Sequence, residues 1–328
     1  MPVVFAAIFI LIMAFTALSG VNDGGNLVGT YLSSSRVKPF ISVSLLVVSI
    51  LAGPILFGTR VSHTIAVEIV NFHTAGHLVL VMALLGALLT LGVTWYLSIP
   101  TSATLALAGA MVGAVLLEGH WEWIQWGGIL KVVIGLVGSV VVGFMAAYVI
   151  SRFLWVVMKR FPGLGFRVGN AQWGTIVLQG LAYGANDQEK AIGLMAVLVM
   201  LVSHHTHYTV TWVAIVLPWL AWVLGLFAGG LRIAKTVSGH IFRLRDAARV
   251  STQMGAGLTV AMAAVLGLPV STTQTTDGSV FGTGAALNPY QVRWGTAGKF
   301  LRVWALTLPL AVALGGVVMG GARLIQAM

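Results

Sequence analysis

Two short motifs place carboxylates beside amides within otherwise apolar stretches of the chain. Asn22 and Asp23 follow Gly20, and the same pattern recurs about 165 residues later, where Asn186 and Asp187 follow Gly184. A carboxylate surrounded by hydrocarbon is costly unless a cation, a proton or hydrogen-bond donors accompany it. Carboxylate and amide oxygens are the ligands that hard cations prefer. The two pairs therefore indicate two cation sites, and the structural alternative is a pair of helix N-caps.

A second motif repeats in the same order and at nearly the same spacing. Residues 100–104 (PTSAT) correspond to residues 269–273 (PVSTT). Each motif puts hydroxyl groups where a new helix begins, and the N-terminus of a helix attracts anions through its free N–H groups and its dipole. The motifs therefore indicate an oxyanion site. The alternative is that the hydroxyls cap their helices or bond back to the preceding turn.

Other polar residues are weaker evidence for a binding site. Lys190 follows Asp187 by three residues, which suits either a salt bridge or a contact with an anion. His204, His205 and His207 resemble a metal-binding tract, but no acidic residue or cysteine lies beside them, so we expect an ordinary solvated turn. The sequence has no Gly-Lys-Ser phosphate loop, GxSxG motif or HExxH motif. Neither an ATP-driven pump nor an enzyme is indicated.

The elements that must position these motifs are membrane-spanning helices. Of the 328 residues, 58% are hydrophobic and 8% are charged, whereas soluble domains have roughly 25% charged residues. Apolar runs of about 20 residues recur along the chain, and each can cross roughly 30 Å of hydrocarbon. The runs are continuous, which argues against a membrane β-barrel. The sequence predicts an all-α polytopic protein in the lipid bilayer of the cell membrane.

The basic residues suit this class of protein and do not imply a nucleic-acid partner. The chain has 18 Lys and Arg against 8 Asp and Glu, a net charge of +10. Half of the basic residues lie in two segments between apolar runs, 152–167 and 232–249. Such segments face the cytoplasm, so both are assigned to that side. The absence of cysteine excludes disulfides and thiolate metal sites.

The apolar runs predict about 10–12 transmembrane or re-entrant helices. After the first span, the runs cover residues 40–57, 78–98, 101–118, 127–150, 172–183, 191–202, 208–230, 252–268, 270–287 and 303–325. The short runs 172–183 and 191–202 are expected to form one span, broken in its middle by the polar residues 184–190. The pairs that meet at Pro100 and Pro269 fit either two full spans or a hairpin that enters and returns.

The duplicated motifs divide the chain into two homologous halves, residues 1–168 and 169–328. In the predicted threading, the first GxND motif lies on an inward-directed span and the second on an outward-directed span. The halves are therefore expected to have inverted topology, with a broken helix at each GxND motif. Secondary transporters commonly use this plan and bind their substrate between the repeats.

The motifs resemble those of a known family, the PiT family of inorganic phosphate transporters. The matching stretches are residues 20–30 (GVNDGGNLVGT), 184–195 (GANDQEKAIGLM) and 267–274 (GLPVSTTQ). The resemblance implies cation-coupled phosphate transport by alternating access, with sodium or protons as the coupling ions. It also implies an inverted-repeat core, usually in a homodimer, and no cofactor besides these ions.

The resemblance also implies a set of site residues. The residues expected to bind phosphate are Ser102, Thr104, Ser271, Thr272, Thr273, Asn22, Asn186 and Lys190. The residues expected to bind the cation are Asp23, Asn26, Asp187 and Thr101, with sodium at Asp23 and Asp187.

The chain departs from the family pattern at several positions. Gln274 and Tyr183 stand where histidine is common, and Glu189 stands where glutamine is common. The loss of histidines removes groups that titrate near neutral pH, which favours sodium over proton coupling. Sulfate or another tetrahedral oxyanion would fit the same donors. A passive anion channel and a divalent-metal carrier remain alternatives from other classes.

Overall fold

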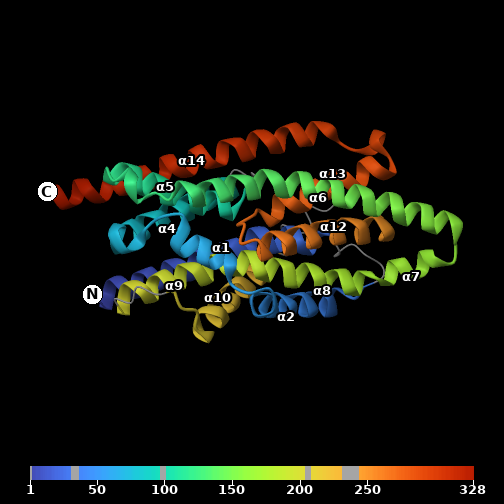
Figure 1. Ribbon diagram of the computed structural model, residues 1–328, viewed down its shortest axis with the longest axis horizontal. Helices are drawn as coiled ribbons and strands as arrows, with labels where there is room; N and C mark the ends of the chain where they lie inside the picture. The colour runs from blue at the N-terminus through green and yellow to red at the C-terminus, as the bar shows by residue number, and fades with distance from the viewer. Residues whose placement is uncertain (1, 31–36, 97–100, 204–207, 231–243) are drawn as a thin grey trace.

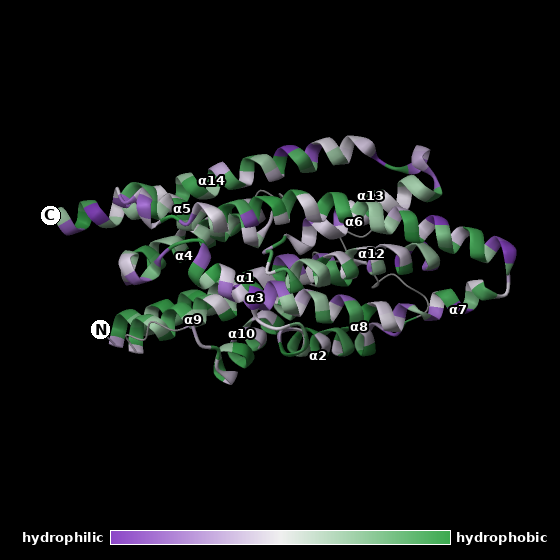
Figure 2. Ribbon diagram, in the orientation of Figure 1, coloured by the Kyte–Doolittle hydropathy of each residue, from purple (hydrophilic) through white to green (hydrophobic). Residues whose placement is uncertain are grey.

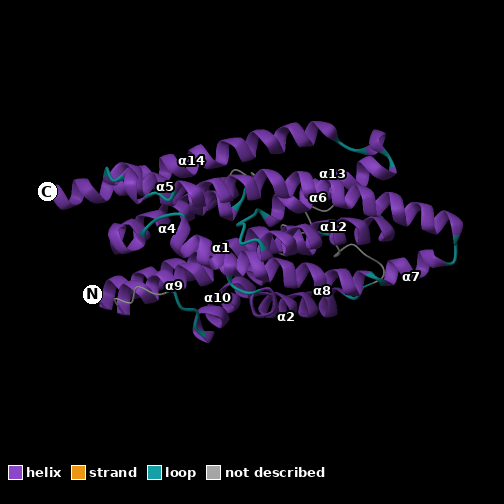
Figure 3. Cartoon of the chain, viewed as in Figure 1, coloured by secondary structure: helices purple, strands orange, loops and turns teal. Residues whose placement is uncertain are grey.

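The chain folds into long helices that run along one common direction (Figure 1). The computed structural model describes residues 2–30, 37–96, 101–203, 208–230 and 244–328. Within these ranges the regular structure is helical, apart from one isolated bridge between Val70 and Ile124, and short loops join the helices (Figure 3). This confirms the predicted all-α fold.

The helices closely follow the predicted apolar runs. The α-helices are α1 (Pro2–Gly29), α2 (Pro39–Phe57), α3 (Arg60–His63), α4 (Phe72–Tyr96), α5 (Ala103–Glu118), α6 (Trp126–Arg160), α7 (Leu164–Asn170), α8 (Gln172–Tyr183), α9 (Glu189–Ser203), α10 (Trp212–Gly225), α12 (Asp246–Val265), α13 (Thr272–Leu287) and α14 (Trp294–Ala327). Short π-helical or 3-10 segments are η1 (Thr64–Glu68), η2 (Trp121–Trp123), η3 (Gly184–Gln188), η4 (Leu226–Gly230) and η5 (Pro289–Gln291).

Six of the described helices are long and apolar enough to cross a membrane. These are α1, α2, α4, α6, α14 and the combined α10 and η4. Figure 2 shows hydrophobic residues along most of the length of the long helices. On α6, the large apolar side chains of Val137, Val141 and Val149 are exposed, as contact with lipid requires. The protein is a multi-pass membrane protein, as predicted.

The two hydroxyl-rich motifs lie at the starts of short helices whose ends meet. Helices α5 and α13 have 16 residues each, which is about 24 Å of helix and less than the roughly 30 Å hydrocarbon layer. Both helices begin near the middle of the molecule and run toward opposite ends (Figure 1). Thr104 in α5 donates a hydrogen bond to the carbonyl of Val270, just before α13, at 2.8 Å. This arrangement favours re-entrant hairpins over full spans for the helix pairs that contain α5 and α13. Pro100 itself lies outside the described residues.

The helices at both GxND motifs are continuous, so the prediction of broken helices is wrong. Helix α1 runs without interruption through Asn22 and Asp23. The carboxylate of Asp23 accepts a hydrogen bond from the hydroxyl of Ser19, one turn earlier on the same helix, so an intact helix already supplies it with a donor. At the second motif, the wider turn η3 joins α8 directly to α9. Such π turns often occur at functional sites in helices.

The division of the chain into two halves stays a prediction. The expected boundary between residues 168 and 169 falls within the short helix α7. Of the two basic segments, residues 231–243 lie outside the described residues. The end of α6 and the start of α12 lie at the end of the molecule opposite the two chain termini (Figure 1).

Close packing of α1 against α10 fixes the position of the first aspartate. A Cβ atom on Gly20 of α1 would lie 2.1 Å from the carbonyl oxygen of Trp222. A Cβ atom on Gly225 of α10 would lie 1.8 Å from the carbonyl oxygen of Ala17. Small residues permit this approach of helix backbones in a membrane. Because Asp23 follows Gly20 within one turn, the contact sets both the depth and the rotation of its carboxylate.

Helix α5 makes an equally close contact with α14, which a substitution can test. A Cβ atom on Gly113 would lie 1.9 Å from the carbonyl oxygen of Val312. At Gly92 of α4, no atom of the described residues outside the local helix backbone lies within 4 Å of the Cβ position. We expect Gly113→Ala to separate the helices and lower the free energy of unfolding by about 1–3 kcal/mol. Gly92→Ala is the matched control and should be neutral or stabilising. Thermal unfolding in detergent measures both, and equal midpoints would contradict the packing.

Candidate functional site

The first turn of α13 contacts both predicted aspartates. Thr273 donates a hydrogen bond from Oγ1 to Oδ1 of Asp23 at 2.9 Å. The adjacent Thr272 donates to Oδ2 of Asp187 at 2.7 Å. The carboxylates are buried, with 2% of Asp23 and 5% of Asp187 exposed. The two GxND motifs therefore meet at one pair of neighbouring hydroxyls.

Asp23 has further partners on its own helix. Ser19 donates from its hydroxyl to Oδ2 of Asp23 at 2.8 Å. Asn26 donates from Nδ2 to the hydroxyl oxygen of Thr273 at 3.0 Å. Ser19 and Asn26 share a helix face with Asp23, because residues three and four apart are neighbours on a helix. Ser19 was missed from the sequence, although this spacing could have indicated it.

The second aspartate forms a buried ion pair. Oδ1 of Asp187 lies 2.5 Å from Nζ of Lys190, and both side chains are 2% exposed. A buried ion needs an opposite charge or several donors, so each of the two stabilises the charged form of the other. Of the two roles that the sequence leaves open for Lys190, the structure shows the salt bridge. The pair also places a positive charge inside the site.

The two motif asparagines differ in their contacts. Asn186 donates from Nδ2 to the carbonyl of Leu268 at 3.0 Å and accepts a hydrogen bond from the N–H of Val270 at 3.2 Å. It therefore holds the segment that leads into α13. The Nδ2 atom of Asn22 is buried and has no partner among the described residues. Asn22 therefore keeps a donor for a ligand.

The hydroxyls of the first-half motif have mainly structural partners. Ser102 caps α5 by accepting a hydrogen bond from the N–H of Leu105 at 3.3 Å, and Ser271 caps α13 in the same way. The hydroxyl of Thr101 pairs with that of Thr307 in α14 at 3.0 Å. The structure does not bring Thr101 to either aspartate.

Tyr183 positions the first turn of α13 against the second GxND motif. Its hydroxyl bonds to the hydroxyl of Thr276 and donates to the carbonyl of Thr272 at 3.1 Å. Its side chain is 1% exposed. Sequence reasoning noticed Tyr183 as a departure from the family pattern but not as a contact, because the contact depends on the packing of α8 against α13.

Several polar atoms of the motif segments are buried without a hydrogen-bond partner among the described residues. They are Nδ2 of Asn22, both amide atoms of Gln188, Nε2 of Gln274 and Oε1 of Glu189. Buried polar groups in folded proteins nearly always have a partner. These atoms therefore remain available to water or to a polar ligand.

The central residues include two acidic side chains and one basic side chain, Asp23, Asp187 and Lys190. An oxyanion in this region of low dielectric constant would need opposite charge or several hydrogen-bond donors beside it. Among the described residues, no group of three or more His, Cys, Asp and Glu could hold a metal ion, so backbone, amide and hydroxyl oxygens would have to complete any cation site.

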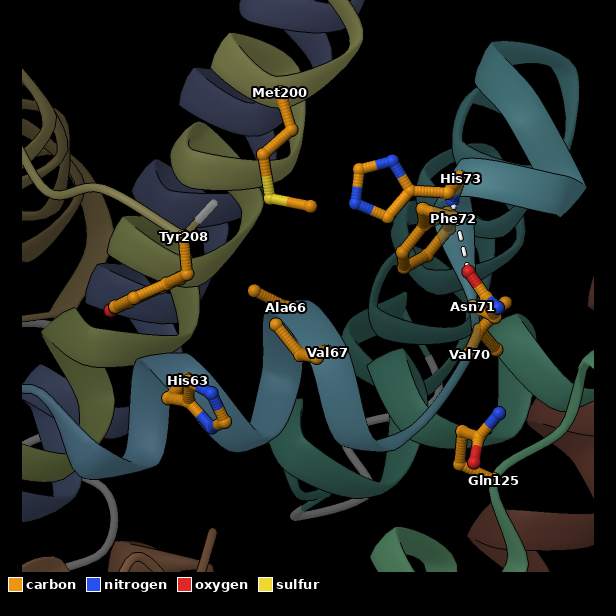
Figure 4. Close-up of a pocket in the computed structure, with 10 residues that line it drawn as sticks. All are labelled: His63, Ala66, Val67, Val70, Asn71, Phe72, His73, Gln125, Met200 and Tyr208. Atoms are coloured by element: carbon orange, nitrogen blue, oxygen red, sulfur yellow. Dashed lines mark hydrogen bonds between the residues drawn. The ribbon is translucent and has the colours of Figure 1, made fainter. Parts of the chain in front are cut away.

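A cavity of about 410 Å³ is lined by residues outside the predicted site (Figure 4). Its lining includes His63, Met200 and Tyr208, and it includes no residue of the predicted site. The hydroxyl of Tyr208 pairs with that of Ser62, whose N–H donates to Oε2 of Glu189 at 3.0 Å. The cavity wall is thus joined to the segment that carries Asp187. The histidine tract His204, His205 and His207 lies outside the described residues.

Next to this cavity, Glu68 binds two basic side chains. Its carboxylate lies 2.6 Å from Nζ of Lys131 and 3.3 Å from Nδ1 of His63. Partial burial acts to raise the pKa of Glu68, but the hydrogen bond and charge of Lys131 outweigh burial and lower the pKa. Glu68 is therefore ionised at neutral pH.

Comparison with known proteins identifies the family. A family model described as the phosphate transporter family matches residues 19–163 and 164–315. The chain belongs to the phosphate transporter family. A probable low-affinity inorganic phosphate transporter of Bacillus subtilis strain 168 is 31% identical to it over 316 residues, which is 94% of each chain. A relative of the same description from Rhizobium meliloti is 32% identical over 317 residues, covering 95% of this chain and 94% of the relative.

A solved structure shares the fold of this member of the phosphate transporter family. That protein, named as the sodium-dependent phosphate transporter, matches with a TM-score of 0.85 and 22% sequence identity. The match covers 98% of this chain and 100% of the other. The family model and the relatives from Bacillus subtilis and Rhizobium meliloti confirm the family resemblance drawn from the motifs.

The role of Thr273 can be tested against a neighbouring threonine. Thr273→Val removes the donor to Asp23 and the acceptor for Asn26, so we expect the free energy of unfolding to fall by about 1–3 kcal/mol. Thr275→Val is the matched control, because that hydroxyl donates at 2.8 Å to the carbonyl of Ser271 in its own helix. Thermal unfolding of the purified variants compares the two. An equal loss in both would show that the contact with Asp23 contributes nothing specific.

Proposed function

We propose that this protein is a secondary active transporter that moves inorganic phosphate together with sodium by alternating access. Its relatives in Bacillus subtilis and Rhizobium meliloti are described as probable low-affinity inorganic phosphate transporters. The protein with the matching fold is named as a sodium-dependent phosphate transporter. Transport of this kind involves no covalent chemistry, which agrees with the absence of enzyme motifs from the sequence.

One observation carries the proposal: adjacent hydroxyls bind the carboxylates of both GxND motifs. Thr272 and Thr273 join Asp187 and Asp23 at the start of α13. A cation at either carboxylate would therefore lie beside the donors of that helix end. The geometry supports one shared site in which cation and anion are neighbours.

The phosphate would bind where the starts of α5 and α13 face each other. The first N–H groups of a helix have no partner inside the helix and carry partial positive charge. Ser102, Thr104, Ser271, Thr272 and Thr273 add hydroxyls at these two ends. Asn22, Asn186 and Lys190 supply amide and ammonium donors. Together they could replace the water around a tetrahedral oxyanion.

The sodium ions would bind at Asp23 and Asp187, with Asn26 as a further ligand of the first ion. Thr101 belongs to the same proposed set, although its hydroxyl contacts Thr307 in this conformation. Each cation lowers the electrostatic cost of burying the anion, and the anion does the same for the cation. This reciprocity would couple the sodium gradient to phosphate movement.

Inverted repeats and a homodimer remain part of the proposal. The opposite directions of α5 and α13 (Figure 1) are what two inverted halves would produce. Sulfate would fit the same hydroxyls, so competition between phosphate, sulfate and arsenate should accompany any transport assay.

Uptake of radiolabelled phosphate into proteoliposomes tests the function. We expect an inward sodium gradient to drive uptake, and a proton gradient without sodium to drive it less. Asp23→Asn keeps the shape of the side chain but removes the charge that a cation needs, so uptake should fall about tenfold or more.

Glu122→Gln is the matched control, since Glu122 is an exposed carboxylate in the turn η2, and its uptake should equal that of the wild type. If no phosphate or sulfate enters under either gradient, the proposal fails. If uptake depends on neither gradient and is unchanged in Asp23→Asn, the protein is a passive anion channel.

A further inference from the structure

Asp277 is a buried carboxylate that the proposed transport mechanism leaves without a role. It lies in α13, four residues after Thr273, and is 6% exposed. It has neither a hydrogen-bond partner nor an ion-pair partner among the described residues. A carboxylate in an apolar interior needs a proton, a cation or donors to balance its charge. Since the described residues offer Asp277 no donor, a proton, a cation or water has to balance its carboxylate.

The elements packed against α13 bring two more acidic residues to its first turn. The helices packed against α13 are α1, α6 and α12, together with η5. Helix α1 contributes Asp23, which accepts a hydrogen bond from Thr273, and the second motif contributes Asp187, which accepts one from Thr272. Neither carboxylate offers Asp277 a positive charge.

The basic residues of the packed helices are engaged elsewhere. Arg152 of α6 donates to the carbonyl of Ala286 at 3.4 Å, and Arg249 of α12 donates to the carbonyl of Thr30 at 2.9 Å. Lys131 of α6 pairs with Glu68, and Lys159 and Arg160 of α6 lie over aromatic rings. The remaining charged residue of these helices is Asp246, at the start of α12. The described part of η5 has Tyr290 as its titratable residue, and its side chain is exposed.

The hydroxyls around Asp277 do not form a sodium site. Thr273 donates to Asp23, and Thr276 bonds to Tyr183. Ser279 contacts the carbonyl oxygens of Gly143 at 3.1 Å and Thr275 at 2.9 Å. A hard cation needs several oxygens directed at one point, and none of these hydroxyls forms a hydrogen bond with the carboxylate of Asp277. A single proton satisfies the carboxylate without any further ligand.

We propose that Asp277 is a proton-binding site on the transport path, separate from the sodium sites at Asp23 and Asp187. The proton adds to one carboxylate oxygen and leaves from it again when water reaches the side chain. No covalent bond other than O–H forms or breaks. This proposal rests on the proposed transport function, which supplies the anion whose binding the proton would affect.

The position of Asp277 links its proton to the anion. Asp277 and Thr273 lie one turn apart on the same face of α13. An ionised Asp277 would repel an oxyanion at the start of the helix, and a protonated Asp277 would not. Protonation and anion binding therefore favour each other, and linkage makes the effect reciprocal. Phosphate uptake should be faster at a pH where Asp277 is protonated and slower where it is ionised.

The test compares the pH dependence of uptake by wild type and Asp277→Asn at a fixed, saturating sodium gradient. Asparagine imitates the protonated side chain and cannot ionise. We expect the ratio of wild-type to variant uptake to fall about fivefold or more between about pH 6 and about pH 9. Titration of phosphate itself affects both proteins equally and cancels in this ratio. Asp277→Glu keeps a titratable group and should restore the pH dependence.

A constant ratio across this pH range would overturn the proposal. So would a variant whose sodium dependence changes while its pH dependence stays that of the wild type, because Asp277 would then be a sodium ligand. Glu122→Gln is the matched acid-to-amide control and should leave the pH profile unchanged.

Infrared spectroscopy distinguishes failure of this proposal from failure of the transport function. Other carboxyl groups, such as the buried Glu189, contribute to the C=O band of protonated carboxylic acids, so the measured quantity is the difference between the spectra of wild type and Asp277→Asn at the same pH. The wild-type band should be stronger by the contribution of one carboxyl group. This signal requires no transport. If wild type shows this difference but moves no phosphate, the proposed function fails and the proton site stands. If uptake occurs but the two spectra have the same band, the proton site is wrong.

Discussion

The structure depends on stabilising two carboxyl side chains in a region without bulk water. Asp23 and Asp187 are almost fully buried, and an isolated ion in such surroundings would be strongly destabilising. The protein stabilises them with short-range partners: Ser19 and Thr273 for Asp23, and Thr272 and Lys190 for Asp187. These partners come from three separate parts of the chain, so the carboxylates act as connectors between helices as well as candidate cation ligands.

Close helix packing makes these connections possible. Gly20 and Gly225 let the backbones of α1 and α10 approach each other, which sets the position of Asp23. The hydrogen bond from Thr104 to Val270 joins the starts of α5 and α13. As a result, two helix N-termini with partial positive charge lie beside two carboxylates. Such a mixture of charges suits the joint binding of a cation and an anion better than the binding of either alone.

Much of this arrangement could be predicted from the sequence, because it is recorded in local patterns. Apolar runs located most of the described helices, but α4, α12 and α14 begin earlier than expected and α6 continues to Arg160. Duplicated motifs identified Asp23, Asp187 and the hydroxyls of α13. The continuity of α1 was not predicted, because Gly20 and Gly24 looked like helix breakers, whereas they permit close contact with α10. Spacing alone could not show which role these glycines have.

Long-range partners could not be predicted at all. The sequence does not show that Thr101 bonds to Thr307, that Tyr183 contacts Thr276, or that Asp277 has no partner among the described residues. Each of these facts depends on how one helix is rotated against another. The cavity beside Tyr208 is likewise formed by segments that are distant in the sequence.

We propose that cation and anion share one site and bind with reciprocal coupling. Calorimetry on the purified protein in detergent can measure the Kd for phosphate at several sodium concentrations and the Kd for sodium at several phosphate concentrations. We expect sodium to tighten phosphate binding about tenfold and phosphate to tighten sodium binding by the same factor. A Kd for phosphate that does not change with sodium concentration would contradict it.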